Sequence, residues 1–181
     1  MSIVLENSAS NALRIGELTL RLIAEASDQK PAILPLTSLA GRIVVLFVFG
    51  ADCSTCKYLA GLLSEFHDEF KPDVEFIGVC VQSGCEERLE EFRATSNTRI
   101  TLAYCPSREI RPALHIPPGT WLFYPTIIFI DEEQRMRGYF VGGSSFFENT
   151  AANLLGVLGQ LLCKRWLEDA IETRERVEVR G

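Results

Sequence analysis

The sequence predicts an α/β fold with a central mixed sheet flanked by helices. The run Ile43–Phe49 is apolar and rich in β-branched residues, as in a parallel-sheet strand that is buried on both faces. An amphipathic helix at Ser54–Phe70 follows it directly, and a second strand begins at Val74. A strand–turn–strand pattern at Thr126–Val141 adds an antiparallel edge.

The first elements form an N-terminal β extension of this sheet. Residues Leu18–Glu25 alternate between apolar and polar side chains, which predicts a strand. The polar turn Ser27–Pro31 separates this strand from a partner strand at Ala32–Leu36. A short turn at Ser38–Arg42 then leads into the buried strand Ile43–Phe49.

The next helix has an apolar face that repeats at helical spacing. It spans Ser54–Phe70, and its apolar positions are Cys56, Leu59, Leu63, Phe66 and Phe70. The segment Lys71–Asp73 contains a proline and ends the helix. A second strand is expected at Val74–Val81.

A second helix, a strand and a brief third helix follow. Ser83–Glu86 has the pattern of a capping box, which predicts the start of a helix with Leu89 and Phe92 on its inner face. A short strand is expected at Ile100–Tyr104, and a brief helix at Ser107–Leu114.

The C-terminal part contains a hairpin and a long helix. Pro117–Gly119 is a loop, and the turn Asp131–Gln134 joins the antiparallel strands Thr126–Ile130 and Met136–Val141. A long helix follows from Ser145. Its apolar face contains Leu154, Leu158, Leu161 and Leu162.

These patterns divide the chain into three segments. Residues 1–12 are a flexible N-terminal segment, residues 13–163 form one domain, and residues 164–181 form a charged C-terminal helical extension. A chain of 181 residues, 47% of them hydrophobic, suffices for one domain with a substantial core. We interpret the extension as a solvated helix end. The alternative is a homodimer contact through Trp166, Leu167, Ala170 and Ile171.

Charge and cysteine content exclude several classes of function. The net charge of −6 provides no basic surface for nucleic acid or anionic membranes, and the longest apolar run, Ile43–Phe49, is too short to span a bilayer. Residues 1–12 contain no Lys or Arg and no apolar signal-peptide core. Scattered cysteines would risk mispairing in an oxidising compartment, so we expect a cytoplasmic protein. These cysteines are Cys80, Cys85, Cys105 and Cys163.

The Cys-x-x-Cys pair Cys53 and Cys56 is the strongest chemical signal in the chain. It lies where the buried strand ends and the amphipathic helix begins. The spacing brings both sulfurs into one turn, and the helix N-terminus favours a thiolate on the first cysteine. The thiolate is the nucleophile in thiol–disulfide exchange, so this pair predicts that reaction.

Together these features resemble the thioredoxin-like superfamily, in particular its TlpA- and ResA-type reductases and its AhpC/TSA proteins. The resemblance covers roughly residues 13–162. It rests on Leu13–Gly16, Leu39–Arg42, Val44–Phe49, Cys53–Cys56, Tyr124–Thr126 and Gly142–Gly143. It implies a three-layer thioredoxin-like fold and a thiol-disulfide oxidoreductase without a cofactor. It also implies a protein disulfide substrate and a thiol electron donor.

The resemblance also implies roles for individual residues. Cys53 would attack a substrate disulfide, and Cys56 would resolve the mixed disulfide. Pro125 would be a cis-proline beside the dithiol, and Tyr124 would offer its backbone and ring to the substrate. Asp52, next to the first cysteine, completes the expected substrate-binding residues.

Two departures from the family pattern make the dithiol atypical and leave alternatives open. Asp52 stands where the family usually has Trp, and Phe47 stands where thioredoxins carry a buried acid that relays a proton. A binding module with a degenerate dithiol is therefore one alternative. A peroxiredoxin-like peroxidase is another, although its pattern needs a Thr at the position of Gly50.

The remaining titratable residues have structural interpretations. Structural zinc usually needs two ligand pairs of similar spacing, and Cys80 and Cys85 are separated by four residues, so no metal site is expected. Cys80 is a core residue. Cys85 is either a low-pKa thiol in a helix first turn or, as we favour, a buried one. Cys105 has a regulatory alternative, Cys163 is assigned to packing and His67 to the solvated side of its helix.

Overall fold

The computed structural model describes residues 13–23, 31–117 and 119–178, with side chains described up to residue 166. The segment 1–12, predicted to be flexible, and the end of the predicted strand Leu18–Glu25 lie outside the described residues. The chain forms two compact units, which divide between Ser144 and Ser145. Each unit is described by itself below.

The first unit is built on a mixed sheet of seven strands in the described residues, in the order β2-β1-β5-β4-β3-β6-β7. The strands are β1 (Thr19–Leu22), β2 (Ile33–Pro35), β3 (Ile43–Phe49), β4 (Val74–Cys80), β5 (Thr101–Tyr104), β6 (Thr126–Ile130) and β7 (Met136–Val141). The three central strands β5, β4 and β3 are parallel, whereas β1, β2, β6 and β7 join the sheet in antiparallel pairs. The predicted mixed sheet with an N-terminal β extension is therefore confirmed.

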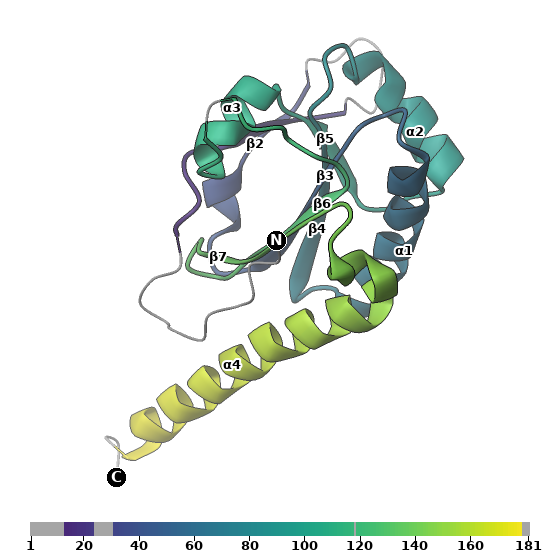
Figure 1. Ribbon diagram of the computed structural model, residues 1–181. Helices are drawn as coiled ribbons and strands as arrows, with labels where there is room; N and C mark the ends of the chain where they lie inside the picture. Colours follow the sequence, from purple (N-terminus) through teal and green to yellow (C-terminus); the bar gives the residue numbers. More distant parts are fainter. Residues whose placement is uncertain (1–12, 24–30, 118, 179–181) are drawn as a thin grey trace. The chain divides into compact units, whose positions relative to one another are not determined.

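Helices cover both faces of this sheet. α1 (Ser54–Phe70) and α2 (Leu89–Ser96) lie on one face, and α3 (Ser107–Ala113) lies on the other (Figure 1). Alternate residues of β3 serve the two faces, because successive strand side chains point in opposite directions. Val44, Leu46 and Val48 join the core cluster that contains Ile110 and Ala113 of α3. On the opposite face, Phe49 stacks on Phe92 of α2, with ring centroids 4.2 Å apart.

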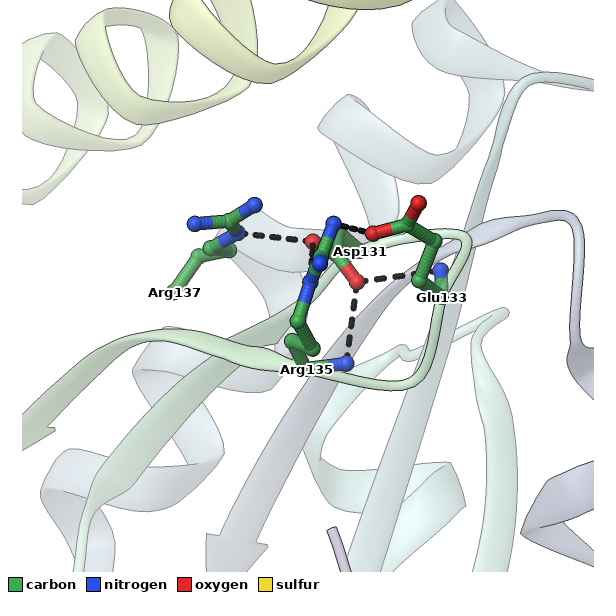
Figure 2. Close-up of polar contacts among 4 residues, drawn as sticks. All are labelled: Asp131, Glu133, Arg135 and Arg137. Atoms are coloured by element: carbon green, nitrogen blue, oxygen red, sulfur yellow. Dashed lines mark hydrogen bonds and ion pairs between the residues drawn. The ribbon is translucent and has the colours of Figure 1, made fainter. Parts of the chain in front are cut away.

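The hairpin β6–β7 is closed by a buried carboxylate (Figure 2). Asp131 accepts hydrogen bonds from the backbone N–H of Glu133 and Arg135 at 3.0 and 2.9 Å. Its other oxygen accepts Nε–H of Arg135 at 3.2 Å and Nε–H of Arg137 at 2.7 Å. Arg135 also pairs with Glu133. The backbone bonds give the predicted turn its shape, and the guanidinium groups balance a charge that would otherwise be costly to bury.

The second unit is helical. A short 3₁₀ helix, η3 (Ser145–Asn149), leads into α4 (Thr150–Glu178), and Nδ2 of Asn153 donates a hydrogen bond to the carbonyl of Phe146 at 2.9 Å. The predicted long C-terminal helix is thereby confirmed, and its four predicted apolar leucines are buried. None of the described helices is both long and apolar enough to cross a membrane.

Three local predictions are wrong. Ser83 does not cap a helix: residues Glu86–Arg88 form a short 3₁₀ helix, η2, without a side-chain cap, and α2 begins only at Leu89. His67 is buried rather than solvated, because it lies one helical turn after Leu63 and its ring meets the edge of Phe76 in β4. Cys163 is exposed rather than packed.

Candidate functional site

The two cysteines of the Cys-x-x-Cys pair lie where β3 passes into α1, as their sequence context predicts. Cys53 is the N-cap residue of α1, with extended backbone dihedral angles. Its sulfur accepts the backbone N–H of Cys56 at 3.1 Å, and its carbonyl accepts the N–H of Lys57 at 3.1 Å. The first sulfur therefore sits against the unpaired amides and the positive dipole end of the helix, which stabilise a thiolate there.

Cys53 and Cys56 are joined by a disulfide, with their Cα atoms 5.1 Å apart. Cys56 is fully buried on the inner face of α1, whereas Cys53 is half-buried. An incoming reactant therefore meets the sulfur of Cys53 first. In the reduced form, Cys56 would stay within reach of any bond formed at Cys53.

Tyr124 and Pro125 lie beside the start of the dithiol loop. The Tyr124–Pro125 peptide bond is cis, and β6 begins at the next residue, Thr126, which pairs with Val48 of β3. The ring of Tyr124 lies against Gly50: a Cβ atom added at Gly50 would be 2.5 Å from Cε2 of Tyr124. A glycine at position 50 is thus what lets the tyrosine ring reach this loop.

Asp52 is exposed and has two partners that the sequence analysis missed. It forms an ion pair with Arg88 and accepts a hydrogen bond from Nε2 of Gln82 at 3.2 Å. Oε1 of Gln82 in turn accepts the backbone N–H of Ala51 at 3.1 Å. These partners are at least 30 residues away in the sequence, so no local sequence pattern predicts their contacts with Asp52. They fix the loop that carries Cys53.

The position of the acid in thioredoxins is occupied by Phe47, which lies in the core. Phe47 is fully buried and stacks on Phe49 with ring centroids 5.3 Å apart. An aromatic ring can neither take nor give a proton, so Phe47 cannot assist the buried sulfur of Cys56 as a general acid or base.

Exposed aromatic side chains occur on the segments that carry the candidate site. Tyr58 follows the disulfide on α1 and is 74% exposed, and Trp121 and Phe123 precede the cis peptide bond and are 80% and 57% exposed. Such rings supply contact area for a bound polypeptide at a low cost in conformational entropy. The sequence analysis did not single out these three residues, because an aromatic residue in a loop or in a helix start gives no periodic signal.

The described residues hold no group of three or more His, Cys, Asp or Glu side chains that could bind a metal ion. The remaining four cysteines are free thiols, and Cys80, Cys85 and Cys105 among them are buried. Cys85 is 2% exposed, which confirms the favoured prediction of a buried thiol, and interaction with Cys80 together with burial raises its pKa. Burial raises the pKa of Cys105 to about 11.

Comparisons with known proteins place this geometry in a wider context. The model of the AhpC/TSA family matches residues 19–139. Among curated proteins, none matches the chain significantly. Many solved structures match, and one is a DsbF homologue from Corynebacterium diphtheriae, 19% identical, with a TM-score of 0.70 over 88% of this chain and 92% of that chain.

Two further structures extend this likeness. A thiol:disulfide interchange protein of the thioredoxin family from Chlorobium tepidum is 17% identical, with a TM-score of 0.66 over 84% of this chain and 98% of that chain. A secreted disulfide oxidoreductase from Mycobacterium tuberculosis is 18% identical, with a TM-score of 0.55 over 70% and 84%. At these identities the likeness concerns the fold, and it confirms the predicted thioredoxin-like architecture.

Proposed function

The chain belongs to the AhpC/TSA family, and we propose that it is a thiol-disulfide oxidoreductase that exchanges electrons with protein disulfides through Cys53 and Cys56. The observation that carries the proposal is the disulfide at the start of α1, in which the sulfur of the N-cap residue Cys53 accepts a helix N–H. This is the environment that makes a cysteine a good nucleophile and a good leaving group.

The reaction needs only the two sulfurs of the pair. In the reduced protein, the thiolate of Cys53 attacks a substrate disulfide and expels one substrate thiolate, which forms a mixed disulfide. Cys56 then attacks the sulfur of Cys53 and expels the second substrate thiolate. The substrate gains two electrons, and the protein returns to the disulfide form. A thiol donor restores the dithiol by the reverse sequence of steps.

Tyr124, Pro125 and Asp52 are the proposed substrate-binding residues. The carbonyl of Pro125 already accepts a hydrogen bond from the N–H of Gly142 at 2.7 Å. The backbone of Tyr124 is therefore the part that would pair with an extended substrate segment. The exposed ring of Tyr124 would cover an apolar substrate side chain. Asp52 would favour a basic residue next to the substrate disulfide.

We also propose a cytoplasmic location, and we keep a homodimer contact through the extension at residues 164–181 as the alternative to a solvated helix end. The four free cysteines outside the pair support a reducing compartment, whereas the structural relative from M. tuberculosis is described as secreted. Cell fractionation with trapped thiols tests the location. Light scattering on a chain that ends near Leu162 tests the dimer: an unchanged mass would reject it.

The test of the proposed function combines a redox titration with an activity assay. Trypsin cleaves after Arg42 and Lys57, so Cys53 and Cys56 share the peptide 43–57, separate from every other cysteine. We expect a reversible two-electron transition on this peptide and reduction of insulin disulfides by the reduced protein. Cys53→Ser should abolish the reduction of insulin, and the exposed-thiol control Cys163→Ser should leave it intact. If peptide 43–57 never forms a disulfide, the proposal fails.

The two alternatives give different results in the same assays. Rapid consumption of peroxide through Cys53 would indicate a peroxidase, for which Gly50 offers no hydroxyl group. A binding module would still bind its partner protein after Cys53 is replaced by Ser. It would not reduce insulin in either form.

A further inference from the structure

A second pair of cysteines lies beside the proposed active site. Cys80 is the last residue of β4, and Cys85 follows the turn at Gln82–Gly84. Their exposed fractions are 0% and 2%. Both are free thiols, and an interaction between the two side chains lowers the pKa of Cys80 and raises the pKa of Cys85. Two buried thiols that interact across a short turn of the chain are candidates for a disulfide.

The surroundings distinguish the two sulfurs of this pair. Interaction with the thiol of Cys85 is the main cause that lowers the pKa of Cys80, and the nearby backbone amides of Gln82 and Ala51 act in the same direction. Contact with Cys80 and burial raise the pKa of Cys85. Of the two thiols, Cys80 lies at the end of β4, in register with Phe49 at the end of β3, so we assign it as the nucleophile towards the Cys53–Cys56 disulfide.

The same surroundings connect Cys80 to the dithiol loop. Cys80 is the register partner of Phe49, the last residue of β3, from which the chain continues to Cys53. The loop and the turn are also tied together through Gln82, whose side chain binds the N–H of Ala51 and the carboxylate of Asp52.

Helix and strand geometry bring Cys80 towards Cys56. His67 of α1 contacts Phe76 of β4, and this contact is a reference point from which the positions of Cys56 and Cys80 can be counted. Cys56 shares the stripe of His67, 11 residues or about 16 Å back along the helix. Cys80 shares the face of Phe76, four residues or about 13 Å forward along the strand. α1 starts at the end of β3 and runs back along the sheet. A step back along the helix and a step forward along the strand therefore lead in the same direction, and both Cys56 and Cys80 lie towards the end of the sheet where β3 and β4 finish.

We propose that Cys80 and Cys85 are a second redox dithiol, which passes two electrons to the Cys53–Cys56 disulfide inside the protein. This inference rests on the proposed function, because that disulfide is the oxidant. Cys80 attacks the sulfur of Cys56, which forms a Cys80–Cys56 bond and releases Cys53 as the thiolate that the helix N-terminus stabilises. Cys85 then attacks Cys80, forms the Cys80–Cys85 disulfide and releases Cys56. The protons of Cys80 and Cys85 pass to Cys53 and Cys56, so two thiols and one disulfide are present before and after.

Peptide mass spectrometry can follow both pairs in the full chain. Lys71 precedes a proline and resists trypsin, so Cys80 and Cys85 share the peptide 58–88, whereas Cys105 and Cys163 lie on other peptides. The fully reduced protein is treated with increasing amounts of oxidised glutathione, quenched in acid and alkylated. We expect a disulfide first on peptide 43–57 and then, with further oxidant, on peptide 58–88.

Variants test whether the electrons take the internal route. Replacement of both Cys53 and Cys56 by Ser should slow oxidation of peptide 58–88 at least about tenfold, because the oxidant would have to reach two buried thiols directly. Cys85→Ser removes the resolving thiol and should accumulate a cross-link between peptides 43–57 and 58–88. Cys105→Ser, an equally buried control, should change neither result.

Two results would overturn this inference. One is a peptide 58–88 that stays reduced while peptide 43–57 cycles normally. The other is oxidation of peptide 58–88 at the same rate with and without Cys53 and Cys56. A peptide 43–57 that never forms a disulfide would instead reject the proposed function, so the two failures are distinguishable.

Discussion

Removal of the carboxylate of Asp131, which closes the hairpin β6–β7, should strongly destabilise the protein. This side chain is only 5% exposed and accepts four hydrogen bonds, two from backbone N–H groups and two from guanidinium groups. Asp131→Ala would leave the side chain of Arg137, only 11% exposed, without its counter-charge. Loss of one partner of a buried ion pair costs about 3–5 kcal/mol.

Asp131→Asn separates the contribution of charge from that of shape. The amide oxygen of Asn can still accept the two backbone N–H groups, so the turn keeps its geometry. Its NH₂ group cannot accept a hydrogen bond from Arg137, and the bond to a charged group is lost. We expect a loss of about 1.5–3 kcal/mol, between the wild type and the alanine variant.

Urea unfolding of the oxidised protein, followed by circular dichroism, measures both losses. A suitable control is Asp68→Ala, because Asp68 and Arg99 form an ion pair with side chains that are 49% and 52% exposed, and solvent screens such pairs. We expect no measurable change in this control. If Asp131→Ala lost less than about 1 kcal/mol, the assigned role of the carboxylate would be refuted.

Three further predictions concern the site and the core. Gly50→Ala should push the ring of Tyr124 away and cost about 1–3 kcal/mol of unfolding free energy, and Tyr124→Ala in the same chain should remove most of this penalty, as a double-mutant cycle in urea would show. Burial lowers the pKa of His67, so the unfolded chain takes up its proton first as the pH falls below about 6.5, and stability should fall with pH. His67→Gln should flatten that pH dependence, and an unchanged slope would contradict it. Asp52→Ala should speed alkylation of Cys53 in the reduced protein, and Arg88→Ala should slow it. Both effects should be less than about fivefold, because the ion pair of Asp52 and Arg88 is solvent-exposed. A salt concentration of 1 M should reduce both effects.

Local patterns predict the elements that carry the site. The buried strand Ile43–Phe49, the helix Ser54–Phe70 and the hairpin strands of β6 and β7 have the predicted bounds. The strand Ile43–Phe49 and the helix Ser54–Phe70 have an unbroken apolar period, the helix has a clear stop at the proline after Lys71, and the hairpin is defined by the turn between its strands.

Contacts between distant segments could not be predicted in this way. The pair of Asp52 with Arg88 joins residues that are 36 positions apart, and neither has a local signal. His67 appears solvent-facing in its helix until β4 is placed against that side. The capping-box pattern at Ser83 fails because the chain forms a turn there, with Gly84 in the left-handed region at φ 67°, before α2 begins.

The packing of Tyr124 on Gly50 also restricts how this sequence can change over generations. A threonine at position 50, which the peroxidase pattern requires, would place its Cβ 2.5 Å from the tyrosine ring. The glycine and the tyrosine therefore constrain each other, and neither position varies freely while the other is kept. A lineage that moved from disulfide exchange to peroxide chemistry would therefore have to displace or replace the ring of Tyr124, and with it a residue proposed to bind the substrate.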